Sequence, residues 1–368
     1  MTVTMHGSPA IGDFDGIDLD MLIRQGFRPV PVSAVRMLTS DVLGIDLNST
    51  EAVAGSTPGS HIEVAVPLPD GPAIRHYSLL AGTAETLRVA VLREHRGRGG
   101  SAWLHENLAS CTSLLARGPR DTFGYDGTGP AYFVAGGIGI TPLTAMIAAS
   151  AAAGRDWHLL YVGRRQESMA FADALVEEYG PERVTIHITE AAGRPDVVSA
   201  VEEWASRREQ PTTVYTCGPV PLMRTLETGF DDHPGISVIS EDFVDADEPA
   251  PPARSARRLG GAAPTSALGS ASGESKDVGT DEEFVVELGD GSEVDVPADC
   301  TIIEALSKAG VRTLSSCKKG TCGTCETVIL DGRADHRDSV LSAEEHAAQE
   351  TMMICVSRAC GKRIALDL

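Results

Sequence analysis

The pattern of apolar and polar residues changes along the chain and divides it into three regions. Over residues 28–126, short apolar runs alternate with polar residues and are separated by Gly, Pro and Asp, which predicts an antiparallel sheet that curls into a β-barrel. Over residues 127–243, continuous apolar runs alternate with helical segments, which predicts an α/β doubly wound parallel sheet. Residues 281–368 return to short strands with helices between them, which predicts a small α+β domain. The chain is therefore expected to be multidomain.

Local signals support the third region. Residues 284–288 and 294–296 flank a Gly-Asp-Gly turn, so they predict a β-hairpin. Thr301 with Glu304, and Ser342 with Glu345, have the spacing of capping boxes and predict the starts of two helices.

Two segments lie outside these regions. Residues 1–27 form an N-terminal extension with one short apolar run and no assigned function. Residues 244–280 are rich in Ala, Pro, Gly, Ser and charged residues, and have too few apolar positions to offset the entropy of ordering them. They predict a flexible linker, and 37 residues of this kind have a root-mean-square span of about 34 Å.

Charge and composition narrow the function. The 31 Lys and Arg against 52 Asp and Glu give a net charge of -21, and no basic run occurs. This argues against nucleic acid or an anionic membrane as a partner. The chain has no signal-like segment and no apolar stretch of membrane-spanning length, and its eight cysteines do not suggest a secreted disulfide framework. A cytoplasmic location is expected.

The most specific motif is a set of four cysteines with the spacing C-x4-C-x2-C and a distant fourth member: Cys317, Cys322, Cys325 and Cys355. This spacing is the plant-type ligand set for a [2Fe-2S] cluster. A structural zinc site and a disulfide pair are the alternatives, but zinc sites favour two C-x2-C pairs and only one occurs here.

A Gly-rich turn follows the apolar run at residues 131–135. A strand, a Gly-rich turn and a helix N-terminus together can receive a pyrophosphate. Thr141 is expected as the N-cap and Pro142 as the first helical residue. The turn differs from the Rossmann fingerprint, because Pro142 replaces the third glycine. The whole motif reads Gly136-Gly137-Ile138-Gly139-Ile140-Thr141-Pro142.

Two further stretches suggest phosphate or nucleotide contacts. In Arg75-His76-Tyr77-Ser78, strand alternation places Arg75 and Tyr77 on one face, toward a ligand with both a phosphate and a ring. An edge strand with a solvated Arg is the alternative. Downstream, Gly99-Gly100-Ser101 precedes a short helix, with Ser101 expected at its N-cap beside a phosphate.

The end of the parallel-sheet region adds candidates. Arg164 and Arg165 follow its second strand, where they can accept an adenosine ribose or a 2′-phosphate, and no nearby carboxylate decides for NAD. Cys217-Gly218-Pro219 ends a later strand. A buried core thiol is the alternative reading of Cys217.

The order and spacing of these motifs over residues 28–368 resemble the phthalate dioxygenase reductase-like family, whose flavin is FMN. Residues 281–368 resemble a plant-type ferredoxin domain of β-grasp fold, and the segment around Cys355 resembles the one that carries the last cluster ligand. The resemblance implies that Arg75, Tyr77 and Ser78 contact the flavin and that Gly99, Gly100 and Ser101 lie near its phosphate. It places Gly137, Gly139 and Thr141 near a pyrophosphate, Cys217, Gly218 and Pro219 beside the nicotinamide, and Glu241 and Phe243 beside the flavin ring.

The resemblance implies an NADH-dependent reductase that passes electrons through FMN and a [2Fe-2S] cluster to a terminal oxygenase with Rieske non-haem iron or haem. The flavin is needed because a hydride brings two electrons and the cluster accepts one. An FAD-using or NADPH-using version of the same reductase is one alternative. A non-catalytic redox-sensing or metal-binding module is another.

Overall fold

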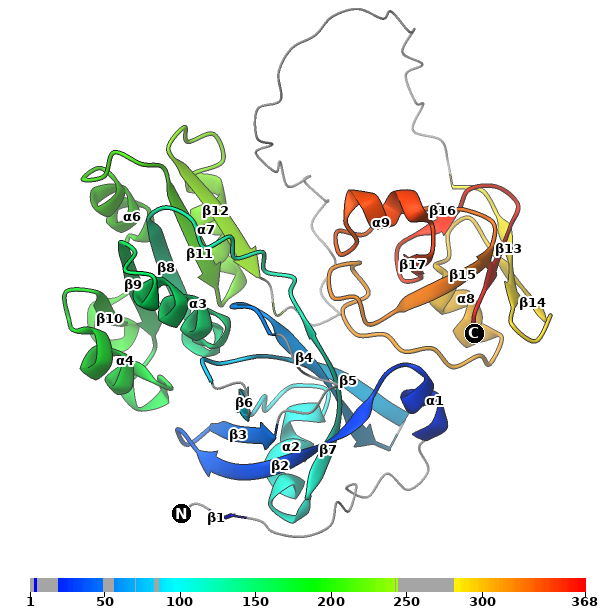
Figure 1. The fold of residues 1–368 in the computed structure, drawn as a ribbon, viewed down its shortest axis with the longest axis horizontal. Coiled ribbons are helices and arrows are strands. Elements are labelled where there is room, and N and C mark those ends of the chain that lie inside the picture. Colours follow the sequence, from blue (N-terminus) through cyan, green and yellow to red (C-terminus); the bar gives the residue numbers. More distant parts are fainter. Residues whose placement is uncertain are drawn as a thin grey trace, which may run out of the picture. The chain divides into compact units, whose positions relative to one another are not determined.

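The computed structural model describes residues 3–4, 19–48, 56–69, 71–82, 86–241, 243 and 281–368. The chain forms two compact units that divide between Phe243 and Val244 (Figure 1). The predicted linker, residues 244–280, lies outside the described residues, as does most of the segment before Leu19.

The first unit begins with an antiparallel sheet of seven strands. Six follow the order β5-β4-β7-β2-β3-β6, and β1 pairs with β2. The strands are β1 (Val3–Thr4), β2 (Arg28–Met37), β3 (Val42–Asn48), β4 (His61–Leu68), β5 (Gly71–Ser78), β6 (Thr86–Leu92) and β7 (Ser113–Arg120). Helix α2 (Gly100–Asn107) covers one end of this core and buries Leu104 completely.

The apolar run of the N-terminal extension packs onto this sheet. Helix α1 (Leu19–Arg24) buries Leu22, and Phe27 is also fully buried. The guanidinium of Arg117 lies 4.8 Å from the centroid of the Phe27 ring and donates a hydrogen bond of 2.9 Å to the carbonyl of Gln25. The extension is therefore part of the folded first unit from Leu19 onward.

Strand β4 departs from the expected alternation, because its polar residues are buried as well as its apolar ones. Glu63 is only 2% exposed and His61 only 4%. Glu63 is tolerated there because Arg117 and His76 both bind its carboxylate. The sequence pattern did not indicate this burial, because the pairing of Glu63 depends on residues of β5 and β7 that are distant from β4 in the chain.

The second part of the first unit is a parallel sheet of five strands in the order β10-β9-β8-β11-β12. Its strands are β8 (Ala131–Gly136), β9 (Trp157–Gly163), β10 (Val184–Ile188), β11 (Thr212–Cys217) and β12 (Ile236–Glu241). Its helices are α3 (Ile140–Ala152), α4 (Ala172–Tyr179), α5 (Thr189–Ala192), α6 (Val197–Ala205) and α7 (Val220–Gly229).

The alternation of side chains along β8 explains why this sheet carries helices on both faces. Phe133 packs in one apolar cluster with residues of α3 and α4. Tyr132 and Val134 pack in a second cluster with residues of α6 and α7. Every residue of β8 is buried, so its continuous apolar run serves two cores at once (Figure 1).

The second unit is a mixed sheet in the order β14-β13-β19-β15-β17, in which β13 and β19 pair in parallel. It contains β13 (Phe284–Leu288), β14 (Glu293–Val296), β15 (Glu326–Asp331), β16 (Ala334–Asp335), β17 (Thr351–Met353), β18 (Arg358–Ala359) and β19 (Arg363–Leu366). Helix α8 (Ile302–Lys308) buries Ile302 and Leu306 against this sheet.

The local signals of this unit are confirmed. β13 and β14 form the expected hairpin. Thr301 and Glu304 form a complete capping box at α8, and Ser342 and Glu345 form another at α9 (Ala343–Ala348). In the part of the chain described here, no helix combines the length and hydrophobicity needed to span a membrane.

Candidate functional site

The carboxyl ends of β8 and β11 lie side by side where the order of the parallel sheet reverses. From β8 the chain proceeds outward through β9 and β10, and then returns to the other side of β8 with β11 and β12. Open α/β sheets bind ligands at such a switch point. The Gly-rich turn follows β8 and the Cys-Gly-Pro motif ends β11, so the fold brings the two predicted nucleotide motifs together.

The two motifs touch backbone to backbone, and this contact requires glycine at two positions. A Cβ atom on Gly139 would lie 2.2 Å from the carbonyl oxygen of Cys217. A Cβ atom on Gly218 would lie 2.8 Å from Cα of Gly136, and Gly218 also has a φ of 149°, which other residues rarely adopt. Larger residues would force the two loops apart.

The helix after the Gly-rich turn begins earlier than expected. Helix α3 starts at Ile140 with Gly139 as its N-cap, so the expectation that Thr141 is the N-cap is wrong. Thr141 is 3% exposed, and its Oγ1 donates a hydrogen bond of 3.0 Å to the carbonyl of Ile138. A short 3-10 turn at Gly137–Gly139 leads directly into the helix, which moves its start toward β8.

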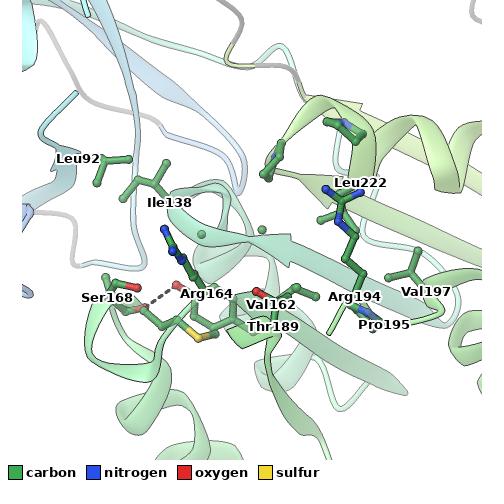
Figure 2. A pocket seen from close by; sticks show the side chains of 18 of the residues that line it. Leu92, Ile138, Val162, Arg164, Ser168, Thr189, Arg194, Pro195, Val197 and Leu222 are labelled. Carbon is green, nitrogen blue, oxygen red and sulfur yellow. Dashed lines mark hydrogen bonds between the residues drawn. The ribbon is translucent and has the colours of Figure 1, made fainter. Parts of the chain in front are cut away.

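A cavity of about 500 Å³ opens along this edge of the sheet (Figure 2). Of the predicted nucleotide residues, Gly137, Arg164 and Pro219 line it, whereas Gly139, Thr141 and Gly218 do not. The wall also includes Val42 and Leu92 from the antiparallel sheet. The cavity therefore lies where an extended nucleotide is expected to cross the carboxyl ends of parallel strands.

Two arginines line the cavity, and one of them was not anticipated from the sequence. Arg164 follows β9, as expected, but Arg165 is turned into a bidentate ion pair with Glu190 at 2.6 and 2.9 Å. Arg194, which follows α5, lines the cavity instead. The sequence did contain a signal for Arg194, because this residue follows the carboxyl end of a parallel strand, β10, and ligands bind at that edge of the sheet.

Cys217 and Glu241 are register partners at the ends of β11 and β12. Cys217 is fully buried and packs in the same apolar cluster as Phe123 and Leu143. It does not line the cavity described above. The structure thus shows a buried thiol next to a carboxyl group, and the role of the thiol beside a nicotinamide stays a prediction.

Glu241 occupies an unusual environment. Its Oε1 accepts a hydrogen bond of 3.1 Å from Thr122, while its buried Oε2 has no hydrogen-bond partner among the described residues. Burial raises the pKa of Glu241 to about 7, the Thr122 bond lowers it, and nearby Asp121 raises it further. A carboxyl group with one buried oxygen that lacks a hydrogen-bond partner is suited to bind a polar ligand. Phe243, the other residue expected here, is 45% exposed.

The two stretches suspected of phosphate contacts meet at the start of α2. A Cβ atom on Gly100 would lie 2.6 Å from Nε of Arg75, so Arg75 lies directly against the first helical turn. Arg75 also donates a hydrogen bond of 3.4 Å to the carbonyl of Arg98. Helix α2 has no side-chain cap and no acidic residue in its first turn. Its free N–H groups beside a guanidinium fit a phosphate.

The remaining residues of these stretches divide between the site and the core. Tyr77 is half-buried at the edge of the apolar core, and burial raises its pKa far above the ordinary value. Ser78 is 4% exposed. Ser101 is not the N-cap as expected, because Gly99 takes that position with a φ of 83°, and Ser101 Oγ instead accepts a hydrogen bond of 3.0 Å from the N–H of Glu94.

In the second unit, the four cysteines of the motif form two pairs of thiols in contact. Cys317 and Cys322 hydrogen-bond to each other, and so do Cys325 and Cys355. Cys322 and Cys325 are close enough to affect each other electrostatically. Two linked pairs are the arrangement that a two-iron cluster requires, because each iron takes two protein sulfurs.

The alternatives to a cluster fit less well. All eight cysteines are free thiols, so no disulfide is present. No three of the four thiols have their sulfur atoms within 4.8 Å of one another. Among the described residues, the group of three potential metal ligands that meets this limit is His336, Asp338 and His346, outside the cysteine motif. A single tetrahedral zinc ion needs all of its ligands that close together.

The loop around these cysteines stabilises the thiolate of one of them, Cys317. Hydrogen bonds from the Cys322 thiol, from Thr321 and, at 3.3 Å, from the N–H of Lys319 hold the pKa of Cys317 well below its usual value. The contact with Cys317 raises the pKa of Cys322, and the contact with Cys355 raises that of Cys325. Lys318, Gly320 and Gly323 all have positive φ values, which turn the backbone of the loop around the sulfurs. Deprotonated thiols are the form that binds iron.

Comparison with known proteins identifies both nucleotide-binding and cluster-binding regions. A family model for the oxidoreductase NAD-binding domain matches residues 133–228, and one for the 2Fe-2S iron-sulfur cluster binding domain matches residues 285–360. The chain is 34% identical over 346 residues to the carnitine monooxygenase reductase subunit of Escherichia coli (strain K12), with 92% of this chain and 98% of that protein covered.

Two solved structures are similar over nearly the whole chain. Phthalate dioxygenase reductase, described as a modular structure for electron transfer from pyridine nucleotides to [2Fe-2S], is 29% identical with a TM-score of 0.60, covering 94% of this chain and 99% of its own. An intact type IV self-sufficient cytochrome P450 monooxygenase is 36% identical with a TM-score of 0.68, covering 93% of this chain. This chain spans 41% of the length of that cytochrome P450 chain.

Proposed function

Since the chain belongs to the phthalate dioxygenase reductase-like family, we propose that it is the reductase component of an oxygenase system. It is an oxidoreductase with an NAD-binding domain and a [2Fe-2S] domain. Electrons enter from NADH, pass through FMN and the cluster, and leave to a terminal oxygenase. The observation that carries this proposal is the pairing of Cys317 with Cys322 and of Cys325 with Cys355, in the same chain as the nucleotide cavity.

The proposed domains follow from this assignment. Residues 28–126 are the FMN-binding β-barrel, to which the extension 1–27 is added, and residues 127–243 are the doubly wound NAD-binding domain. Residues 244–280 are the linker, and residues 281–368 are the β-grasp ferredoxin domain. The seven-stranded antiparallel sheet and the mixed sheet around β13 and β19 support the two β assignments.

The nicotinamide nucleotide is expected in the cavity of the first unit. The N-terminus of α3 receives the pyrophosphate, with Gly137 and Gly139 allowing its backbone to approach. Arg164 and Arg194 add positive charge to the same cavity. Cys217, Gly218 and Pro219 follow one another at the carboxyl end of β11, beside the turn after β8, and we assign them to the nicotinamide end.

The flavin is expected between Arg75 and Glu241. Arg75, with the first turn of α2 at Gly99, Gly100 and Ser101, holds the phosphate, and Tyr77 and Ser78 hold the rest of the molecule from β5. Glu241 offers its unpartnered Oε2 to the ring, and Phe243 offers an exposed aromatic face. When bound, FMN supplies the conversion of a two-electron hydride into single electrons.

The cluster is held by Cys317, Cys322, Cys325 and Cys355. It supplies one-electron transfer toward the partner. Residues 281–368 contain 9 Lys and Arg against 17 Asp and Glu, a net charge of -8, so this domain favours a basic docking surface on the oxygenase. One similar structure is a cytochrome P450, so haem and Rieske non-haem iron oxygenases both fit the proposal. The cytoplasmic location stays a prediction.

The visible spectrum of the purified protein tests the proposal. It is recorded anaerobically before and after stoichiometric NADH. Bleaching of both flavin and iron-sulfur bands is the expected result. A flavin spectrum without iron-sulfur bands would overturn the cysteine assignment, and a colourless protein would favour a non-catalytic binding module.

A further inference from the structure

Two histidines and one aspartate of the second unit form a compact cluster outside the cysteine motif. His336 and Asp338 follow β16, and His346 belongs to α9. Each of the three places one potential metal-ligand atom within 4.8 Å of those of the other two. In the sequence they form a His-x-Asp motif with a second histidine eight residues after the aspartate. Neither the cluster nor the nucleotide site uses these side chains.

Asp338 lies close to both imidazoles. Nε2 of His346 is 3.3 Å from Oδ2 of Asp338, and Nδ1 of His336 is 3.7 Å from Oδ1. Two ligand atoms of a tetrahedral metal ion, each bonded at about 2.1 Å, lie about 3.4 Å apart. The observed separations are therefore those of atoms that can share one ion.

The ring of His336 is buried without a hydrogen bond. Its side chain is only 6% exposed, yet neither ring nitrogen has a hydrogen-bond partner among the described residues. Burying such a polar group without a partner costs free energy. A neutral imidazole carries a lone pair on one ring nitrogen, and this lone pair binds metal ions. A metal ion would therefore provide the partner that His336 lacks.

The carboxylate of Asp338 is fixed by its surroundings. The side chain is 0% exposed, and its Oδ2 accepts hydrogen bonds of 3.2 and 2.9 Å from the N–H groups of Val340 and Leu341. Ser357 donates a further hydrogen bond of 3.4 Å to Oδ1. Carboxylates that ligate metal ions are commonly oriented by hydrogen bonds of this kind.

One side chain must turn before all three can reach a common ion. The two imidazole rings stack, with centroids 4.4 Å apart and an angle of 18° between their planes, so their lone pairs do not converge. His346 can turn about its Cβ–Cγ bond because its side chain is 31% exposed. Helix α9 need not move, since Gln349 at its end forms hydrogen bonds of 2.6 and 3.2 Å with the backbone of Ala334 in β16.

The ligand types decide which ions fit. Calcium and magnesium are bound through oxygen, whereas imidazole suits zinc, iron, nickel and copper. Two imidazoles and one carboxylate also leave a coordination position for water, as in zinc sites with three protein ligands. The cluster therefore suits a divalent transition-metal ion.

We propose that His336, Asp338 and His346 bind a divalent transition-metal ion at a site separate from the [2Fe-2S] cluster. This site adjoins the cysteine loop, because the N–H of Ser339 donates a hydrogen bond of 3.0 Å to the carbonyl of Gly320. A Cβ atom on Gly320 would also lie only 3.1 Å from Cα of Asp338. The ion thus stabilises the segment against which the cysteine loop packs. It takes no part in the electron path.

Zinc is the probe for this site. Isothermal titration calorimetry of the full-length protein at pH 7.5 should show an equivalent of Zn²⁺ bound with a Kd of about 10 µM or tighter. His336→Ala and His346→Ala should each weaken this binding at least about tenfold. His346 is partly exposed, so its substitution tests the site even if His336→Ala fails to fold. Absence of this binding in the wild type, or unchanged binding in His346→Ala, would overturn the site.

A matched control variant is His95→Ala. His95 belongs to the first unit, and its side chain is 73% exposed. The substitution should leave zinc binding as in the wild type. Equal weakening in this variant would assign the effect to the loss of any histidine and overturn the specific roles of His336 and His346.

X-ray absorption at the zinc edge identifies the ligands of the bound ion separately from iron. Nitrogen and oxygen neighbours at about 2.0–2.1 Å are expected, whereas sulfur neighbours at about 2.3 Å would place the zinc on the cysteines and overturn the site. The inference does not rest on the proposed function. Zinc held by nitrogen and oxygen in a protein that does not oxidise NADH would overturn the reductase function and support the site.

Discussion

Cys217 and Glu241 are register partners at the carboxyl ends of two neighbouring parallel strands, and the carboxyl group retains one buried oxygen without a hydrogen-bond partner. Thr122 holds the other oxygen at 3.1 Å, and its hydroxyl also lies 3.4 Å from Nδ1 of His61. Glu241 therefore joins the parallel sheet to the antiparallel sheet of the first unit. This link leads to the first prediction.

The free energy of unfolding should fall as the pH rises from about 5 to 7. Burial raises the pKa of Glu241 from 4.5 to about 7, so the folded protein keeps a proton there that the unfolded chain releases. The stabilisation from this proton is fully present below pH 4.5 and is lost as the pH rises through 7. Its loss lowers the free energy of unfolding by at most about 3 kcal/mol. Glu241→Gln should remove this slope in denaturant titrations of the full-length protein. Glu203→Gln, at an exposed position of α6, is the control, and identical slopes for wild type and Glu241→Gln would contradict the prediction.

Gly139→Ala should separate the two nucleotide motifs. The added Cβ would lie 2.2 Å from the carbonyl oxygen of Cys217, so the backbone of one loop must shift. We expect a loss of about 2 kcal/mol or more in the free energy of unfolding and a KM for NADH raised about tenfold. Gly235→Ala is the control, because its Cβ would have no neighbour closer than 3.9 Å. Equal effects of both substitutions would show that the close contact is unimportant.

Cys322→Ser should uncouple the two halves of the electron path. It removes one sulfur from the pair formed with Cys317, so the iron-sulfur bands should be lost. NADH oxidation with ferricyanide should continue, because the flavin alone supports it, while reduction of cytochrome c should fall at least about tenfold. Cys360→Ser changes an exposed thiol outside the motif and should keep both activities. Loss of ferricyanide reduction in Cys322→Ser would contradict the order of the electron carriers.

Arg117→Met should strongly destabilise the first unit. It leaves the carboxylate of Glu63, which is 2% exposed, without its bidentate partner, at an expected cost of about 3 to 5 kcal/mol. Burial alone would raise the pKa of Glu63, but hydrogen bonds from His76 and Arg117 outweigh it and hold the pKa well below 4.5. The stabilisation is therefore present above pH 4.5 and lost as the pH falls, so the deficit of Arg117→Met should shrink in acid.

The same unfolding experiments include Arg207→Met as a control. This exposed arginine, just after the end of α6, pairs with Glu203 of that helix, and its loss should cost less than about 0.5 kcal/mol at any pH. A similar cost for both substitutions would show that the Glu63 ion pair adds nothing beyond a surface pair.

Corrections to the sequence-based expectations share one cause. Ser101 and Thr141 are good N-cap residue types, yet Gly99 and Gly139 are the caps, because each helix starts where another segment approaches it closely. Arg75 lies against the turn at Gly100, and Cys217 lies against Gly139. Cap preference is a local property, and here a contact between distant segments outweighed it.

The sequence by itself determined the features that depend on local spacing. The four cysteines predicted the cluster because three of them lie within one loop, and the glycines after an apolar run predicted a strand, turn and helix because these elements are consecutive. The binding of a pyrophosphate at this turn stays a prediction. Capping boxes in the second unit were predictable for the same reason. Each of these signals involves residues only a few positions apart, so no knowledge of the packing was needed.

Only the tertiary structure decided which charges face the cavity. Arg164 and Arg165 are adjacent and alike in sequence, but one lines the cavity and the other binds Glu190, while Arg194 arrives from a separate loop. The same is true of Glu241, whose pKa depends on Thr122, Asp121 and burial between two sheets. Charge pairing and desolvation depend on distances between segments far apart in the chain, and these distances exist only after the sheets have packed.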